Sequence, residues 1–192
     1  MKLTGPIWLM QPIPYFGEKL EGEWIYEEKI DGWRMQIIKF KNEVEFWGRR
    51  LEKKPNWTDK LFYLKDILLK LLPDYTLLDC ELYSDRGRSG IPSLFAKNKN
   101  VKPVIFIFDV IFFNNEFVGT KTLKERKKIL EGLKFVEPFY ILKYENFIDF
   151  SKIKISKDAE GVVFKNLNSI YQVGIEAPIA TIDWRKLKYG YK

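Results

Sequence analysis

The chain has 192 residues, 46% apolar and 31% charged, which is the composition of a folded globular protein and not of a disordered one. Its 33 basic and 26 acidic residues give a net charge of +7, which favours nucleic acid, nucleotides or anionic lipid as partners, although a lysine-rich, heat-adapted surface is an alternative. The absence of histidine excludes Ser-His-Asp and Cys-His hydrolysis, phosphohistidine transfer and histidine–metal sites.

The first half of the chain alternates short apolar runs with turn signals. These patterns predict strands over residues 23–29, 34–40, 43–47 and 75–83, with a hairpin turn at 41–42. A helix is predicted over residues 58–72 because Leu61, Leu64, Leu68 and Leu71 recur at helical spacing and Pro73 follows. The polar segment 85–102 is predicted to be a long loop.

The second half begins with the most apolar segment, residues 104–113, which predicts a central strand buried on both faces. Thr122 and Glu125 form a capping box that opens a helix, and Gly132 can close it. Further strands are predicted over residues 139–144, 161–165 and 182–189. Because hairpins are mixed with two or three helices, without a regular βαβ repeat, we expect an α+β fold with antiparallel or mixed sheets.

The cellular setting is indicated by the cysteine count and by the lack of targeting signals. Cys80 is the single cysteine, so an internal disulfide and a multi-cysteine zinc site are excluded. The N-terminus lacks a signal-peptide pattern, and the longest apolar run is far shorter than the roughly 20 residues of a membrane helix. We therefore expect a cytoplasmic protein with no membrane partner.

The sharpest chemical signal is the segment K-x-D-G-x-R, which starts at Lys29 and ends at Arg34. Asp31-Gly32 favours a sharp turn, so we expect a nucleophile and a phosphate clamp to meet at the mouth of a hairpin. A solvated lysine beside an ordinary turn is the alternative. Lysine has a reference pKa near 10.4, which leaves about one molecule in 2,500 neutral at pH 7, so nearby cations and a metal must assist it. The candidate cations are Arg34, Arg49, Lys165, Lys186 and Lys188.

Six segments between residues 11 and 189 resemble, in order, the motifs of ATP-dependent DNA ligases, within a wider lysine-adenylating family that includes RNA ligases and mRNA capping enzymes. They are E-E-K-I-D-G-W-R at 27–34, F-W-G-R-R-L-E at 46–52, L-D-C-E-L at 78–82, I-F-D-V at 107–110, E-G-V-V-F-K at 160–165 and W-R-K-L-K at 184–188. Gly48, Cys80 and Arg185 depart from the usual serine, glycine and apolar residue. Segments 123–126 and 169–174 resemble features of the DNA ligases in particular.

The resemblance implies the nucleotidyltransferase fold, with an ATP pocket between sheets flanked by helices and a single adenylation domain over residues 1–192. Lys29 would form a phosphoramidate with AMP. Glu27, Ile30 and Phe108 would line the adenosine pocket, and Glu81 would meet the ribose or a metal-bound water. Arg34 and Arg49 would hold ribose and phosphate, with Lys165, Lys186 and Lys188 around the α-phosphate. Glu160, together with Glu81, would contact Mg²⁺.

The implied function is an ATP-dependent DNA ligase, in minimal or core form, that passes AMP from Lys29 to the 5′-phosphate of nicked DNA for sealing by the 3′-hydroxyl. An RNA ligase, a capping-type nucleotidyltransferase and a non-catalytic nucleotide- or DNA-binding module are the alternatives. In the family, an OB-fold domain follows the last motif, whereas four residues follow Lys188 here. We expect no OB-fold domain in the chain, which leaves a fragment, a domain supplied by another chain, or a stand-alone enzyme.

Overall fold

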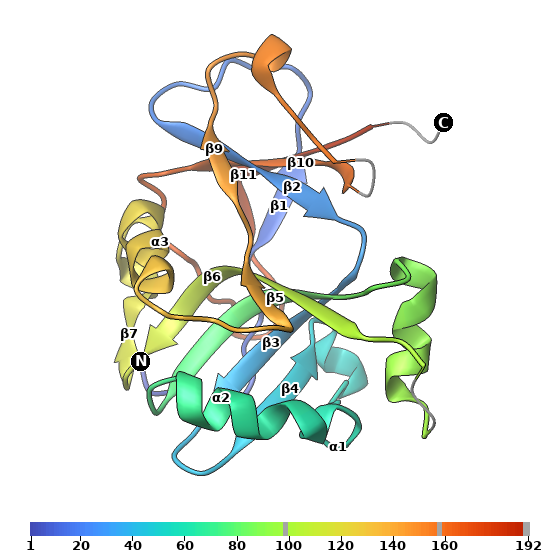
Figure 1. Cartoon of the computed structure of the whole chain (residues 1–192). Helices are drawn as coiled ribbons and strands as arrows, with labels where there is room; N and C mark the ends of the chain where they lie inside the picture. The colour runs from blue at the N-terminus through green and yellow to red at the C-terminus, as the bar shows by residue number, and fades with distance from the viewer. Residues whose placement is uncertain (98–99, 157–158, 190–192) are drawn as a thin grey trace.

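The computed structural model describes residues 1–97, 100–156 and 159–189. These residues form two β-sheets, one above the other in Figure 1, with α3 at the side of the junction. The upper sheet has the order β1-β11-β10-β2-β9, and the lower sheet has the order β4-β3-β5-β6-β7 with β8 beside β6. The β1–β11 and β6–β8 pairs are parallel and the others are antiparallel, so both sheets are mixed, as the sequence predicts.

The regular elements are short, and they have the following bounds. The upper sheet contains β1 Gln11–Pro14, β2 Trp24–Ile30, β9 Tyr144–Asn146, β10 Ala159–Asn166 and β11 Ala180–Lys188. The lower sheet contains β3 Trp33–Lys39, β4 Val44–Gly48, β5 Thr76–Ser84, β6 Pro103–Phe113, β7 Glu116–Phe117 and β8 Phe139–Ile141. The helices are α1 Thr58–Leu61, α2 Lys65–Leu71 and α3 Leu123–Glu131, and the 3-10 turns are η1 Leu51–Lys53, η2 Phe62–Leu64, η3 Arg88–Phe95, η4 Val118–Thr120 and η5 Phe150–Lys152.

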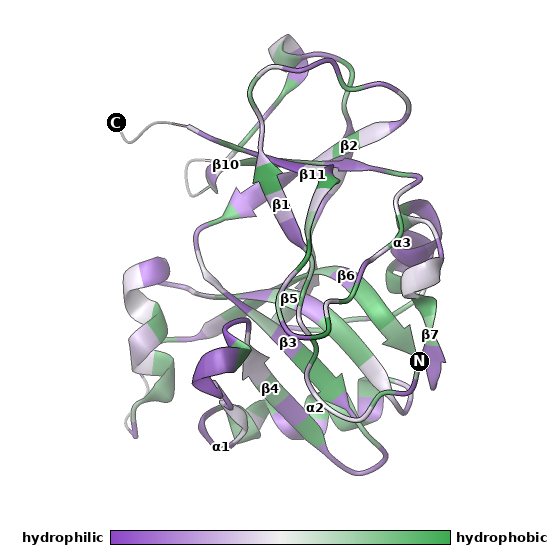
Figure 2. Cartoon of the chain, turned by 180° about the vertical axis from the view of Figure 1, so that it is seen from behind, coloured by the Kyte–Doolittle hydropathy of each residue, from purple (hydrophilic) through white to green (hydrophobic). Residues whose placement is uncertain are grey.

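Two hydrophobic clusters fix the lower sheet against its surroundings. Its outer face packs on the helical segment 58–71, and Cys80 belongs to this cluster, fully buried. Its other face contributes to a cluster that also contains Trp184 of β11, so apolar packing joins the two sheets. The central strand β6 is mostly hydrophobic along its length (Figure 2), which confirms the prediction for residues 104–113.

The helix predicted over residues 58–72 is interrupted, because a 3-10 turn separates α1 from α2. A 3-10 turn has three residues per turn and therefore stacks residues i and i+3 on one side. Leu61 and Leu64 are both buried in this way, and Leu68 follows on the same side. The apolar face is as predicted, but its spacing alone does not distinguish a continuous helix from a broken one.

The loop predicted over residues 85–102 is also more ordered than expected, although residues 98–99 lie outside the described part. It contains the 3-10 segment η3, which buries Ile91 and Leu94 in the cluster beneath the lower sheet. Gly90 and Pro92 within this segment are typical of loops, so the sequence pattern does not predict the 3-10 turn.

A third correction concerns the strand predicted over residues 139–144. Residues 139–141 form β8 beside β6 in the lower sheet, whereas residues 144–146 form β9 beside β2 in the upper sheet. The chain therefore passes between the sheets at Leu142-Lys143. The short strand β1 was not predicted at all, because its two prolines weaken a strand pattern and are tolerated here at a sheet edge.

Candidate active site

The K-x-D-G-x-R segment connects the two sheets. Lys29 is the penultimate residue of β2 in the upper sheet, and Arg34 is the second residue of β3 in the lower sheet. The two strands do not pair with each other, so the predicted hairpin is wrong, although the turn at Asp31-Gly32 is present. The physical reason is that each strand finds a longer partner elsewhere: β2 pairs with β10, and β3 pairs with β5.

Gly32 is required by close packing at this turn. A Cβ atom added to Gly32 would lie 2.4 Å from the backbone oxygen of Leu82 and 2.8 Å from Cγ of Glu81. Both distances are shorter than van der Waals contact, so only glycine lets the turn rest against β5. The close contact brings the Lys29 turn against β5, a central strand of the lower sheet.

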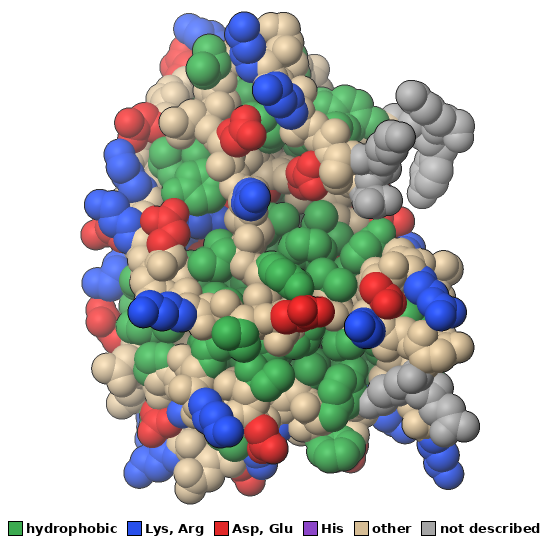
Figure 3. Space-filling model, viewed as in Figure 1, with side chains coloured by type: hydrophobic (Ala, Val, Ile, Leu, Met, Phe, Trp, Pro, Cys, Tyr) green, Lys and Arg blue, Asp and Glu red, His purple; other side chains and the backbone are tan. Residues whose placement is uncertain are grey.

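A cavity of about 940 Å³ opens between the sheets at this turn. Every residue that the sequence nominates lines it: Glu27, Lys29, Ile30, Arg34, Arg49, Glu81, Phe108, Glu160, Lys165, Lys186 and Lys188. Its lining carries nine basic and five acidic side chains, an excess that favours an anionic ligand. On the molecular face shown in Figure 3, by contrast, basic and acidic side chains are interspersed around a hydrophobic centre.

The amine of Lys29 is held by Glu160. Lys29 Nζ donates a hydrogen bond to Glu160 Oε1, and Lys188 Nζ donates to Glu160 Oε2 at 2.8 Å. Glu160 lies at a register irregularity of β10, next to Gly161, whose φ of 152° and packing against β11 exclude a side chain. Burial works to raise the pKa of Glu160, but the hydrogen bonds from Lys188 and Lys29 lower it overall. Glu160 therefore places an anionic carboxylate directly beside the Lys29 amine.

Arg34 is anchored by a carboxylate from β5. Its Nε and Nη2 atoms donate to the two oxygens of Asp79 at 2.9 and 2.6 Å, and Nη2 also donates to the backbone oxygen of Met10 at 2.7 Å. Tyr171 donates its hydroxyl to the same carboxylate at 2.7 Å. These contacts fix the guanidinium, whose carbon lies 5.4 Å from the centre of the Phe108 ring.

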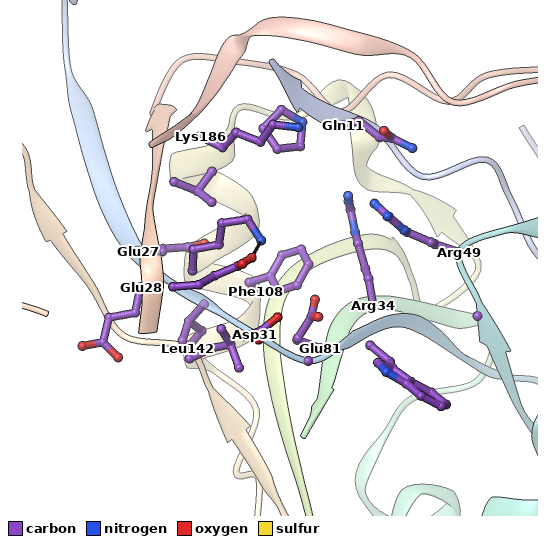
Figure 4. A pocket seen from close by; sticks show the side chains of 18 of the residues that line it. Gln11, Glu27, Glu28, Asp31, Arg34, Arg49, Glu81, Phe108, Leu142 and Lys186 are labelled. Atoms are coloured by element: carbon purple, nitrogen blue, oxygen red, sulfur yellow. Dashed lines mark hydrogen bonds and ion pairs between the residues drawn. The ribbon is translucent and has the colours of Figure 1, made fainter. Parts of the chain in front are cut away.

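Arg34 and Arg49 reach into the cavity from one side, and Lys186 reaches in from the opposite side (Figure 4). Burial and the neighbouring Arg34 lower the pKa of Arg49, and burial and the neighbouring Lys29 lower the pKa of Lys186. Like charges held this close repel one another unless an anion lies between them. The arrangement is therefore suited to binding phosphate oxygens.

The floor of the cavity contains a separate buried group of charges. Lys165 Nζ lies 2.7 Å from Glu27 Oε2 and 4.0 Å from the centre of the Trp184 ring, and both side chains of the ion pair are 2% exposed. Glu27 also accepts a hydrogen bond from Lys127. Lys165 thus lies with Glu27 on the floor, and its predicted contact with the α-phosphate stays a prediction.

Two residues that the sequence analysis did not nominate contact the site. Lys127 of α3 binds Glu27 from below, and Arg88 of η3 donates to Asp31 Oδ1 at 2.6 Å and to the backbone oxygen of Gly32 at 3.1 Å. Arg88 thus holds the turn after Lys29 from outside. Neither residue belongs to a local motif: Arg88 lines the cavity and Lys127 contacts Glu27, each from an element distant in sequence.

Comparisons with known proteins agree with this geometry. Residues 10–188 match the family model described as ATP dependent DNA ligase domain. The chain belongs to the ATP-dependent DNA ligase family. It is 30% identical over 200 residues to a probable DNA ligase of Persephonella marina, and the match covers 93% of this chain and 33% of the relative. It is 28% identical over 179 residues to the prophage-derived DNA ligase-like protein LigB of Bacillus subtilis, with 88% and 62% covered.

Solved structures of DNA ligases show the same fold. Mycobacterial DNA ligase D matches with a TM-score of 0.64 at 18% identity, over 94% of this chain and 60% of that one. The DNA ligase of bacteriophage T7 matches with a TM-score of 0.61 at 16% identity, over 94% and 68%. The predicted nucleotidyltransferase fold is confirmed. This chain spans about a third of the P. marina ligase and under two thirds of LigB.

Two departures from the ligase motifs are explained by packing. A Cβ atom at Gly48 would lie 2.7 Å from the Trp57 ring, so the indole occupies the space that a serine side chain would need. Cys80 lies in the cluster beneath the sheet, because alternation along β5 turns it away from Asp79 and Glu81. Gly48 itself lines the cavity, so the first departure removes a hydroxyl from the lining, whereas Cys80 does not line it.

Glu81 is expected to make the stability of this ligase-family chain depend on pH. Burial raises the pKa of Glu81 to about 7, against the lowering effects of Arg34 and Lys29. Between about pH 4.5 and 7 the folded chain keeps a proton that the unfolded chain has lost, so stability falls as pH rises. Because Glu81→Gln cannot ionise, its free energy of unfolding should rise by about 1–3 kcal/mol relative to that of the parent chain between pH 5 and pH 8. Urea unfolding of both chains at pH 5 and pH 8 tests this. The same stability difference between variant and parent at both pH values would contradict it.

Proposed function

We propose that the chain is the adenylation unit of an ATP-dependent DNA ligase. The observation that carries the proposal is that Lys29 and every other nominated residue line one cavity, with the amine beside a carboxylate and between cationic side chains. The cavity volume of about 940 Å³ lies within the range of ligand-binding sites. Mycobacterial DNA ligase D and the DNA ligase of bacteriophage T7 have been solved in complex with ATP, which supports ATP as the ligand.

The proposed reaction begins with attack of neutral Lys29 Nζ on the α-phosphorus of ATP. A phosphorus–nitrogen bond forms, the bond to the leaving pyrophosphate breaks, and the lysine loses its proton. An oxygen of the 5′-phosphate at a nick then attacks the same phosphorus and releases the lysine. Finally the 3′-hydroxyl attacks the activated 5′-phosphate, so that the strand is sealed and AMP leaves.

The side chains divide these tasks by their chemistry. Arg34 is held rigidly by Asp79, and a preorganised guanidinium stabilises charge that develops on phosphate without reorganising. Arg49, Lys186 and Lys188 add positive charge at the cavity mouth. Glu27, Ile30 and Phe108 would bind the adenosine. We assign Lys165 to the floor of this site, through its ion pair with Glu27.

Mg²⁺ fits the oxygen donors of the cavity. Glu160 and Glu81 both line it, and Mg²⁺ is commonly held by one or two carboxylates together with waters and substrate phosphates. Among the described residues no group of three or more His, Cys, Asp or Glu side chains could hold a metal by itself. When bound, Mg²⁺ would neutralise charge on the phosphate oxygens.

Nicked duplex DNA is the proposed substrate, and an OB-fold domain is a proposed partner. We place the chain in the cytoplasm, because its single cysteine is unpaired. No helix in the described parts of the chain is long and apolar enough to cross a membrane.

Sealing of a labelled nick tests the function. The chain, with ATP and Mg²⁺ and with or without an OB-fold domain added as a separate protein, should join a 5′-phosphate to a 3′-hydroxyl in nicked DNA, and Lys29→Ala should not. Parallel reactions with nicked RNA and with GTP should be weaker. ATP binding that is identical in Lys29→Ala, with no sealing or adenylation by the parent chain under any condition, would instead indicate a binding module.

A further inference from the structure

Lys127 is a buried lysine that no proposed reaction step uses. It lies on α3, outside the six motifs, and its side chain is 1% exposed. Its Nζ donates to Glu27 Oε1 and, at 2.9 Å, to the backbone oxygen of Phe108. We propose that Lys127 is a positioning residue for base recognition, which holds Glu27 and the Phe108 backbone in one fixed arrangement. The proposal rests on the adenine-nucleotide site proposed above.

The placement of Lys127 is fixed by the helix that carries it. The capping box at Thr122 sets the start of α3, and Arg126, the residue before Lys127, donates two hydrogen bonds to Asp109 of β6 at 2.7 and 3.0 Å. With the helix held in this register, Lys127 points beneath β2 and β6, where Glu27 and Phe108 lie. Lys124 on the same helix is 54% exposed.

A buried ammonium at this place is energetically unfavourable unless its donors are satisfied. Removing a charge from water costs several kcal/mol in a protein interior, and an apolar side chain of similar volume commonly packs at least as well. Lys127 has two oxygen acceptors and lies 5.1 Å from the centre of the Tyr144 ring. The charge is therefore compensated, and what it adds beyond packing is a fixed position for the Glu27 carboxylate.

Fixing Glu27 has a consequence for the base that the cavity accepts. An ionised carboxylate has about four acceptor positions and no donor. Lys127 takes one position on Oε1 and Lys165 lies against Oε2, so the remaining positions can only accept. At position 6 of a purine, such a group favours the amino group of adenine and disfavours the carbonyl oxygen of guanine. Without Lys127 the carboxylate would be held from one side only.

The test compares binding and reaction for adenine and guanine nucleotides. Calorimetry gives the Kd values of AMP and GMP, which require no lysyl-AMP, and single-turnover reactions give the rate of lysyl-AMP formation and its half-saturating ATP concentration. For Lys127→Met we expect the preference for AMP over GMP to fall about tenfold, which is about 1.4 kcal/mol. The half-saturating ATP concentration should rise about tenfold, and the saturating rate should stay within about threefold.

Two other variants provide the controls. Lys127→Arg keeps the charge and should recover most of the preference, and Lys124→Met, on the exposed side of α3, should behave as the parent chain. Thermal melting checks folding, and if Lys127→Met does not fold, the same loss of preference is expected in Lys127→Gln. A folded Lys127→Met or Lys127→Gln chain with an unchanged AMP/GMP preference overturns the inference. If the parent chain prefers AMP but forms no lysyl-AMP, the result counts against the proposed function alone. The AMP and GMP Kd values still test the role of Lys127, because binding does not require the reaction.

Discussion

Replacing Arg126 with leucine should lower the free energy of unfolding by about 3–5 kcal/mol, because it leaves a buried carboxylate without its partner. Arg126 and Asp109 are both 0% exposed, and two hydrogen bonds join them. Arg126 also donates to the backbone oxygens of Lys121 at 2.6 Å and Ser169 at 3.1 Å. The leucine variant would remove the donors to Asp109 Oδ2 and to the Lys121 oxygen, whereas Asp109 Oδ1 keeps the Val110 amide and the Ser169 oxygen keeps the Leu123 amide. Urea unfolding at neutral pH measures the difference.

Lys124→Leu is the matched control for Arg126→Leu. Lys124 lies on the same helix, but its ion pair with Glu23 joins side chains that are 54% and 60% exposed. Exposed ion pairs contribute about 0–1 kcal/mol, so this substitution should change stability by no more than that. Adding Asp109→Leu to Arg126→Leu should recover part of the loss. A loss below about 1 kcal/mol for Arg126→Leu would show that this ion pair does not hold α3 to β6.

Replacing Gly32 with alanine should slow lysyl-AMP formation about 100-fold. The added Cβ would lie 2.4 Å from the backbone oxygen of Leu82, so the turn must move away from β5 and carry the end of β2 with it. A displacement of about 1 Å of a reacting group is enough to reduce a rate by about 10²-fold. Single-turnover reaction with labelled ATP measures the rate, and urea unfolding separates it from any loss of stability.

Gly5→Ala is the control for the turn, because no atom lies within 4 Å of a Cβ added there. This variant should form lysyl-AMP at the parent rate. If Gly32→Ala also reacted at the parent rate, the close contact between the turn and β5 would not be what positions Lys29.

The sequence predicts which residues form the site better than it predicts how the strands that carry them pair. All of the nominated residues line one cavity, and most of them lie in short motifs along a strand, where alternation puts every second side chain on the same face. Glu27 and Lys29 both face the cavity for this reason, and Cys80 faces away from it. The pairing of strands is not encoded locally, so the link from β2 to β3 was mistaken for a hairpin.

Contacts between distant segments account for the remaining differences. Lys127 meets Glu27 across 100 positions of sequence, and no pattern around Lys127 distinguishes it from its exposed neighbour Lys124. The strand predicted over residues 139–144 divides because its two ends find partners in different sheets. Such choices depend on which edge of a sheet is free when the chain packs, and periodicity does not contain that information.

Mass spectrometry of the chain after incubation with ATP and Mg²⁺ tests the central claim, that Lys29 becomes bonded to AMP. The proposed chemistry predicts one added adenylate per chain, located on the peptide that contains Lys29 and absent from Lys29→Ala. An intact, folded chain that acquires no adenylate, or that acquires it on another side chain such as Lys186, would contradict the assignment of Lys29 as the nucleophile.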